Sequence, residues 1–125
     1  MKKILVVEDE LAYLKLLKSQ LCEKGYTIIE AADGKKGLEL AKSQKPDLIL
    51  LDIRMPVMDG MSMLKELRKS EVAEKAKTKV IILTNLEPDD KILVGVVSDQ
   101  PSFYLVKSDI VLNNLLEKIK ELLVE

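Results

Sequence analysis

The stretch that decides the fold of this chain is LILLDIRMPVMDG, residues 48–60. Four bulky apolar residues stand in a row before Asp52, and Pro56 and Gly60 interrupt the pattern after it. An apolar run without polar alternation is typical of a strand covered on both faces, as the central strands of parallel sheets are. Ligands of open α/β sheets bind beyond the carboxyl ends of such strands. The sequence therefore predicts a buried central strand that ends on a candidate functional carboxylate, Asp52.

The rest of the chain alternates between apolar runs and segments with helical spacing. Strands are predicted at residues 3–7, 27–31, 48–51, 80–83 and 102–106, and helices at 10–24, 34–45, 61–69, 88–97 and 112–123. Parallel strands need helical crossovers, which are right-handed. The pattern predicts an α/β domain: a five-stranded parallel sheet with helices on both faces and residues 27–31 at its edge.

The composition excludes several classes of protein. The 125 residues suit one domain, and 47% hydrophobic with 33% charged residues is typical of a globular chain without a membrane span. The start MKKILVVEDE lacks the apolar stretch of a signal peptide, which predicts a cytoplasmic protein. With 20 basic and 21 acidic residues the net charge is −1, so we expect no direct binding of nucleic acid.

Residue counts also restrict the chemistry. The chain contains no histidine and one cysteine, Cys22, which excludes an internal disulfide, thiol or imidazole metal sites and histidine-based nucleophilic catalysis. Any bound metal must therefore have oxygen ligands. Cys22, on the first predicted helix, is expected to be buried or half-buried, as free cysteines usually are.

Polar side chains follow four of the predicted strands at their carboxyl ends. They are Glu8 and Asp9, Asp52, Thr84, and Lys107. Each has a simple structural explanation as a turn, a solvated end or a cap, and Asp9 is well placed to cap the first helix. Because the strands are parallel, all five residues are expected at one edge of the sheet, and that coincidence favours a functional site.

Three carboxylates at one edge repel one another, so either one is protonated or a cation lies between them. Mg²⁺ suits a site that offers only oxygen ligands, and its usual chemistry is phosphoryl transfer. Lys107 and Thr84 would then contact the phosphoryl oxygens, and Asp52 is left as the nucleophile. The chain has no P-loop motif, which favours a small or protein-borne phosphoryl donor.

These residues resemble a known family, the receiver domains of two-component response regulators. The resemblance rests on VVEDE (residues 6–10), LILLDIRMPVMDG (48–60), VIILT (80–84) and YLVK (104–107), in that order along the whole chain. It implies a flavodoxin-like (βα)5 fold with strand order 2-1-3-4-5, and a single receiver domain over residues 1–125. Family likeness supplies that strand order; a chemotaxis regulator of this family is a known example of it.

The resemblance also implies roles for individual residues in phosphorelay signal transduction. Asp52 would accept a phosphoryl group from a histidine kinase, a phosphotransfer protein or a small acyl phosphate. Mg²⁺ would be bound by Asp9, Asp52 and the backbone carbonyl of Arg54, with Glu8 acting mainly through water. Lys107 would pair with the phosphoryl group.

Signal output is implied to pass through a switch in which Thr84 moves to bond the phosphoryl group and Tyr104 swings inward. A downstream protein or a second copy of the chain would then bind the face formed by the fourth helix, fifth strand and fifth helix, near Ile92, Tyr104 and Leu116. Such a protein is no conventional enzyme, since it catalyses only its own phosphorylation and dephosphorylation.

Two other functions are compatible with the sequence. An aspartyl-nucleophile phosphatase would use a similar set of residues, but it needs a second acid two positions after the nucleophile, where this chain has Arg54. A degenerate receiver could act as a phosphorylation-independent binding module. That alternative is raised by Ser108, where the family usually has proline after the lysine, and by Asn85, where a smaller residue is usual.

Overall fold

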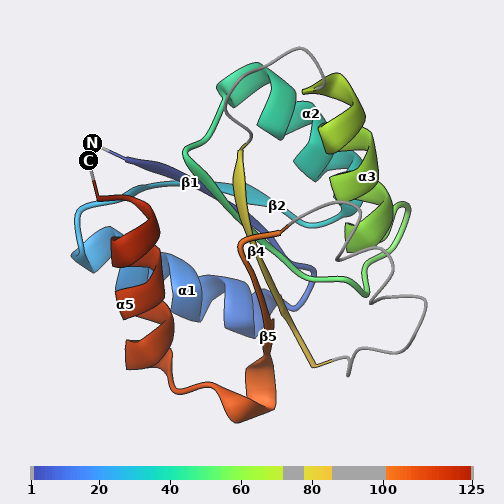
Figure 1. Cartoon of the computed structure of the whole chain (residues 1–125). Coiled ribbons are helices and arrows are strands. Elements are labelled where there is room, and N and C mark those ends of the chain that lie inside the picture. The colour runs from blue at the N-terminus through green and yellow to red at the C-terminus, as the bar shows by residue number, and fades with distance from the viewer. Residues whose placement is uncertain (1, 72–77, 86–100, 125) are drawn as a thin grey trace.

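The computed structural model describes residues 2–71, 78–85 and 101–124 of the chain. Five parallel strands form one sheet in the order β2-β1-β3-β4-β5 (Figure 1). Their bounds are β1 Lys3–Val7, β2 Thr27–Ala31, β3 Leu48–Leu51, β4 Lys79–Thr84 and β5 Phe103–Val106. Both the predicted strand order and the edge position of β2 are confirmed.

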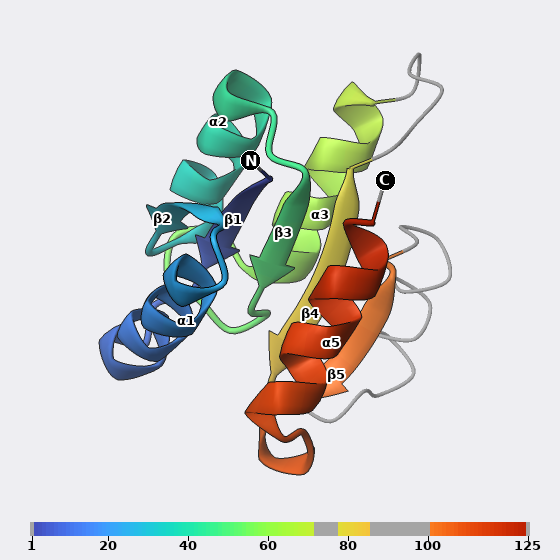
Figure 2. The same cartoon turned by 90° about the vertical axis from the view of Figure 1, so that its left-hand side faces the viewer.

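Helices cover both faces of the sheet. The α-helices are α1 Leu11–Glu23, α2 Gly34–Gln44, α3 Gly60–Ser70 and α5 Leu112–Leu122, and a short 3-10 helix, η1, spans Lys107–Asp109. Figures 1 and 2 show α1 and α5 against one face and α2 and α3 against the other. The helix predicted at residues 88–97 lies outside the described residues. None of the described helices is long and apolar enough to cross a membrane.

The alternation of side chains along each strand produces two separate cores. Ile4 and Val6 of β1 belong to the cluster under α1 and α5, whereas Leu5 and Val7 belong to the cluster under α2 and α3. The four residues of β3 divide between the two clusters in the same way. Burial on both faces explains why β1, β3 and β4 read as continuous apolar runs.

Two local predictions are wrong, and both concern α1. Asp9 does not cap this helix: the residue at the cap position is Glu10, and its side chain makes no capping hydrogen bond. Cys22 is exposed, because it follows Leu21 by one residue, about 100° around the helix from the buried face. Leu14, Leu17 and Leu21 form that buried face.

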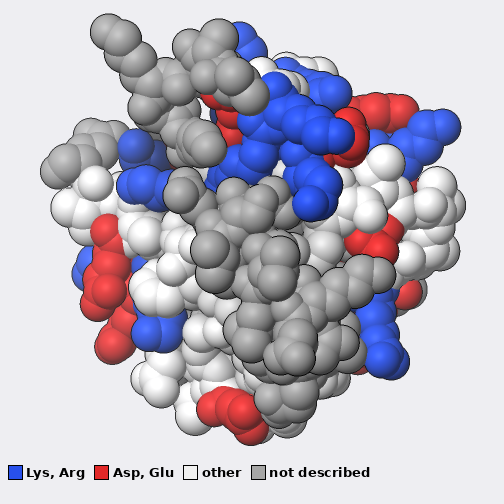
Figure 3. All heavy atoms as spheres, turned by 45° about the vertical axis from the view of Figure 1, so that its right-hand side comes forward, with Lys and Arg blue, Asp and Glu red and all other residues white. Residues whose placement is uncertain are grey.

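Many charged side chains lie on the surface, where Lys and Arg gather in the upper part of Figure 3 beside Asp and Glu.

Arg68 and Glu71, at the end of α3, are buried instead, with side-chain exposures of 7% and 6%. Their ion pair has an Nη1 to Oε2 distance of 2.8 Å. A buried charge is stable only if its hydrogen-bonding groups are satisfied.

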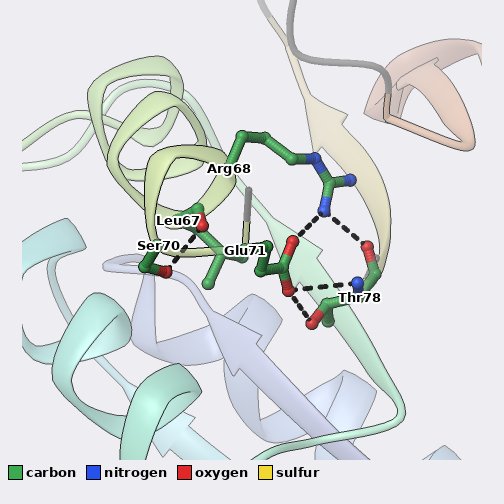
Figure 4. Close-up of polar contacts among 5 residues, drawn as sticks. All are labelled: Leu67, Arg68, Ser70, Glu71 and Thr78. Atoms are coloured by element: carbon green, nitrogen blue, oxygen red, sulfur yellow. Dashed lines mark hydrogen bonds and ion pairs between the residues drawn. The ribbon is translucent and has the colours of Figure 1, made fainter. Parts of the chain in front are cut away.

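Thr78, immediately before β4, satisfies these groups (Figure 4). Its carbonyl oxygen accepts a hydrogen bond from Arg68 Nη1 at 2.8 Å, and its backbone N–H donates to Glu71 Oε1 at 3.1 Å. Its hydroxyl donates to the same carboxylate oxygen. The pair therefore joins the end of α3 to the start of β4, at the amino edge of the sheet.

We expect the substitution Arg68→Met to lower the free energy of unfolding by about 3 kcal/mol or more, because it leaves the buried Glu71 carboxylate without its cation. Lys69→Met is the matched control: Lys69 is on the same helix, but its ion pair with Glu66 is exposed. This substitution should lower the free energy of unfolding by less than about 0.5 kcal/mol. Urea unfolding of both variants measures the difference, and equal losses would contradict a stabilising role for the buried pair.

Candidate functional site

The register of the sheet brings the predicted site residues together. Val7 of β1 lies opposite Leu51 of β3, and the next residue, Asp52, continues the pairing through its N–H, which donates to Val7 O at 3.0 Å. Asp52 therefore lies beside the residue that follows Val7, which is Glu8. On the other side of β3, β4 and β5 end together, with Thr84 opposite Val106. Lys107 follows at the same edge.

The three predicted acids form a cluster at this edge. One carboxylate oxygen from each of Glu8, Asp9 and Asp52 lies within 4.8 Å of the others. Glu8 and Asp52 are buried, whereas Asp9 is exposed. Lys107 lies between the two buried acids: its Nζ donates a hydrogen bond to Glu8 Oε1 and lies 3.4 Å from Asp52 Oδ2. The structure thus brings together four of the residues that the sequence indicated.

Backbone groups hold the two buried carboxylates in place. Ile53 N–H donates to Asp52 Oδ1 at 2.7 Å, and Glu10 N–H donates to Glu8 Oε2 at 3.1 Å. The backbone at Asp52 is itself packed against α3, since a Cβ added at Gly60 would lie only 2.0 Å from Asp52 O. Only glycine permits this close approach. Both carboxylates are therefore fixed, with one oxygen of each directed to the Lys107 ammonium.

Burial dominates the electrostatics of the cluster. It raises the pKa of Glu8 from 4.5 to about 7, and repulsion from Asp52 adds to the rise, while hydrogen bonds from Lys107 and from the Glu10 N–H oppose it. For Lys107, burial acts to lower the pKa, but the hydrogen bond to Glu8 and the charge of Asp52 outweigh it, and the pKa is raised. One ammonium thus incompletely compensates three carboxylates, and a divalent cation suits this donor set.

An open cleft of about 320 Å³ lies over the cluster. Its lining residues are Asp9, Glu10, Asp52, Arg54, Thr84, Asn85 and Lys107. Thr84 is only 1% exposed and lies at the end of β4, whereas Arg54 and Asn85 are exposed. A small phosphate-containing ligand entering the cleft would meet an acid, a hydroxyl and an ammonium together. Arg54 and Asn85 thus border the cleft.

Tyr104 is not among the described residues that line this cleft. It is half-buried on β5, opposite Ile82 of β4, and packs against the cluster under α2 and α3. The side chain is therefore close to the strand that carries Thr84 without being part of the site. Its role in a switch stays a prediction.

Lys107 reaches the acids although Ser108 follows it. The peptide bond between these two residues is trans, and the lysine begins the 3-10 helix η1. The Lys107 ammonium therefore reaches the site even though position 108 is serine and not the proline usual in the family.

Sequence analysis overlooked Tyr13, which also contacts the site. The Lys107 Nζ lies over the Tyr13 ring, 4.4 Å from its centroid. A signal was present in the sequence, since Tyr13 follows Asp9 by four residues at the beginning of a helix, so it stays near the same edge of the sheet. From helical spacing alone, however, an aromatic residue at this position is interpreted as part of the hydrophobic core.

Comparison with known proteins agrees with this geometry. The family model described as "Response regulator receiver domain" matches residues 4–120. The chain belongs to this receiver family. The match covers nearly the whole chain, including all the strands whose ends form the acidic cluster.

Curated relatives of this receiver domain are transcriptional regulators. The alkaline phosphatase synthesis transcriptional regulatory protein PhoP of Bacillus subtilis is 41% identical over 93 residues, covering 74% of this chain and 37% of PhoP. The transcriptional regulatory protein PdtaR of Mycobacterium tuberculosis is 37% identical over 108 residues, covering 85% of this chain and 49% of PdtaR. The chain thus aligns with less than half the length of each of these relatives.

Solved receiver structures resemble this chain over nearly the whole length of both proteins. A CheY-like response regulator receiver domain protein from Methanospirillum hungatei has a TM-score of 0.85 at 30% identity, covering 97% of this chain and 92% of that one. The response regulator TrrA of Thermotoga maritima, solved in complex with Mg(2+)-BeF, has a TM-score of 0.83 at 36% identity, covering 98% and 100%. The receiver fold, with its parallel sheet of order 2-1-3-4-5, is therefore shown by sequence and by structure.

Proposed function

We propose that this receiver domain accepts a phosphoryl group on Asp52 and thereby acts as a switch in a phosphorelay. The observation that carries the proposal is the position of Asp52: a buried carboxylate that ends a central strand, faces an open cleft and lies 3.4 Å from the Lys107 ammonium. Fixed positive charge beside a nucleophile suits phosphoryl transfer, in which positioning and charge stabilisation supply most of the catalysis.

In the proposed reaction an oxygen of Asp52 forms a bond to phosphorus while the bond from phosphorus to the donor's leaving group breaks. The Ile53 N–H fixes the carboxylate orientation by binding Oδ1, and Oδ2 lies on the side of Lys107. Lys107 would exchange Glu8 for the incoming phosphoryl oxygens, and Thr84, at the same cleft, would donate its hydroxyl to them. The product is an acyl phosphate that water can hydrolyse.

We infer that Mg²⁺ is the cofactor. The residues that fit it are Asp9 and Asp52 as direct ligands, Glu8 through water, and the backbone carbonyl of Arg54. When bound, the ion would neutralise charge on the phosphoryl oxygens. Support comes from the three clustered carboxylates, from the raised pKa of Glu8 and from the Mg(2+)-BeF complex of the Thermotoga maritima relative.

The proposed donors are a histidine kinase, a phosphotransfer protein or a small acyl phosphate. The phosphatase alternative is disfavoured by Arg54, which borders the cleft at the position where such an enzyme needs an acid. The binding-module alternative is disfavoured because Lys107, in spite of Ser108, contacts both buried acids. The cytoplasmic location, the absence of nucleic-acid binding and the single-domain organisation over residues 1–125 stay predictions.

Incubation with Mg²⁺ and acetyl phosphate should add one acid-labile phosphoryl group to the protein, and Asp52→Asn should abolish the addition because the nucleophile is lost. Intact-mass spectrometry measures both. Asp59→Asn is a suitable control, since Asp59 is an exposed cap of α3 outside the cleft. Full phosphorylation of the Asp52→Asn variant would show that Asp52 is not the phosphoryl acceptor.

We expect Asp9→Asn to weaken Mg²⁺ binding by about tenfold or more, since it removes a carboxylate ligand. Glu10→Gln is the matched control: it makes the same change in charge on the neighbouring residue, which lines the cleft but is not a proposed ligand. Calorimetric titration distinguishes the two variants. Equal losses of affinity would mean that Asp9 acts only through its charge at a distance.

The proposed output surface combines the fourth helix, which lies outside the described residues, with β5 and α5. Within the described part, Tyr104 on β5 is half-buried. Leu116 on α5 is half-buried too, but it lines a pocket with Tyr26 beside α1. We infer that phosphorylation draws Thr84 inward and that Tyr104 follows, because Thr84 and Tyr104 lie on adjacent strands. The partner is a downstream protein or a second copy of the chain. For the shift to occur, the phosphoryl group must interact more favourably with the switched state.

Phosphorylation should change amide NMR shifts beyond the site, in Phe103–Val106 and in residues 91–97. In Thr84→Ala these distant changes should be lost while those beside Asp52 remain, because the hydroxyl link is missing. Spectra of both proteins, recorded with and without acetyl phosphate, provide the comparison. Changes confined to the neighbours of Asp52 in the unmodified sequence would instead favour the binding module.

A further inference from the structure

Among the described residues, the Lys107 ammonium contacts two acids and one aromatic ring. Its Nζ contacts Glu8 Oε1 and Asp52 Oδ2, and the third neighbour is the face of the Tyr13 ring, 4.4 Å from the centroid. The lysine side chain is only 7% exposed. A cation above an aromatic face is attracted by the ring quadrupole, and the attraction is stronger where water is excluded. Tyr13 therefore contacts the ammonium in addition to the two acids.

The ring is held in place by packing that is independent of the lysine. Tyr13 lies in the first turn of α1 and packs against the cluster under α1 and α5. The next residue, Leu14, and Leu17 one turn later anchor this helix in the same cluster. The ring is thus held by α1 and its packing, whereas the lysine reaches the site from a different segment, η1.

The electrostatic surroundings of the Tyr13 hydroxyl agree with this position. Burial raises the pKa of Tyr13, the charge of Lys107 opposes the rise, and the charges of Glu8, Glu10 and Asp52 add to it. The phenol is therefore neutral at physiological pH. A neutral ring differs in an important way from a third acid, because it holds a cation without adding charge that would compete with an incoming phosphoryl group.

We propose that Tyr13 is a positioning residue for phosphoryl transfer, which keeps the Lys107 ammonium over the site while the lysine exchanges Glu8 for the phosphoryl group. This inference rests on the function proposed above. With the ring present, the ammonium stays shielded from water and close to the reacting oxygens. Without the ring, this side of the ammonium would be hydrated, and the lysine would spend less time in a productive position.

Three variants separate this role from simple packing. Tyr13→Leu removes the aromatic face but keeps an apolar side chain, and Tyr13→Phe keeps the face and removes only the hydroxyl. Tyr26→Leu is the matched control, because Tyr26 packs against the same cluster but lines a separate pocket with Lys24 and Leu116. Urea unfolding of all three shows whether each variant is folded.

The first measurement is the rate constant of phosphorylation by acetyl phosphate with Mg²⁺. Tyr13→Leu should lower it by about fivefold to twentyfold, the range expected for losing one half-buried cation-π contact. Tyr13→Phe and Tyr26→Leu should stay within about twofold of the original protein. Equal rates for Tyr13→Leu and the original protein would overturn the positioning role, and so would an equal loss in Tyr13→Phe.

The second measurement needs no phosphorylation. Protons that lie over an aromatic face are shifted upfield in NMR spectra, so the ε-methylene protons of Lys107 should be shifted in the original protein and in Tyr13→Phe, but not in Tyr13→Leu. Absence of the shift in the original protein would overturn the contact itself. If the original protein is not phosphorylated by acetyl phosphate, the proposed function is overturned. If it is phosphorylated and Tyr13→Leu reacts equally fast, only the role of Tyr13 is overturned.

Discussion

The ion pairs of Lys107 allow two carboxylates to lie buried beside each other at the end of the sheet. Glu8 is 3% exposed, and without a cation its charge and that of Asp52 would be expensive to remove from water. Even with the ammonium present, burial keeps the pKa of Glu8 at about 7. One ammonium therefore offsets only part of the repulsion among the clustered carboxylates.

This arrangement depends on the parallel sheet, which has chemically different edges. The carboxyl edge holds the acids, the lysine and Thr84, and its geometry is set by continued pairing from Val7 to Asp52. The amino edge holds the pair of Arg68 and Glu71, whose hydrogen bonds are satisfied by Thr78. Both clusters include β4 or a residue next to it, so one strand is anchored at its start by Thr78 and carries Thr84 at its other end, beside the cleft.

The two buried clusters differ in charge and in chemistry. Arg68 forms hydrogen bonds both to the Glu71 carboxylate and to the Thr78 carbonyl, and both side chains of the pair are buried. Lys107 instead has two acids and a neutral ring as neighbours beside an open cleft. An ammonium on a long side chain can exchange one acid for a phosphoryl oxygen more easily than a guanidinium fixed by its planar geometry. This contrast explains why a lysine suits the functional edge.

The order of residues along the chain was enough to predict a parallel α/β sheet and the edge at which its polar strand ends meet. Apolar runs and helical spacing predicted the parallel sheet, and parallel strands require that Glu8, Asp9, Asp52, Thr84 and Lys107 share one edge. Such patterns work because burial on both faces leaves no polar alternation in a strand, and because strand direction alone decides the edge at which its last residue lies. Family likeness supplied the strand order.

The contacts between individual side chains could not be predicted from the order of residues and became visible in the folded structure. It placed Lys107 against Glu8 as well as Asp52, set Tyr13 under the ammonium, and buried Arg68 with Glu71. It also left Asp9 without a capping role and Cys22 exposed. Spacing along the chain gives the edge or the helix face of a residue, but the direction of a long side chain depends on neighbours from distant segments. Those neighbours are fixed only when the sheet and its helices are packed together.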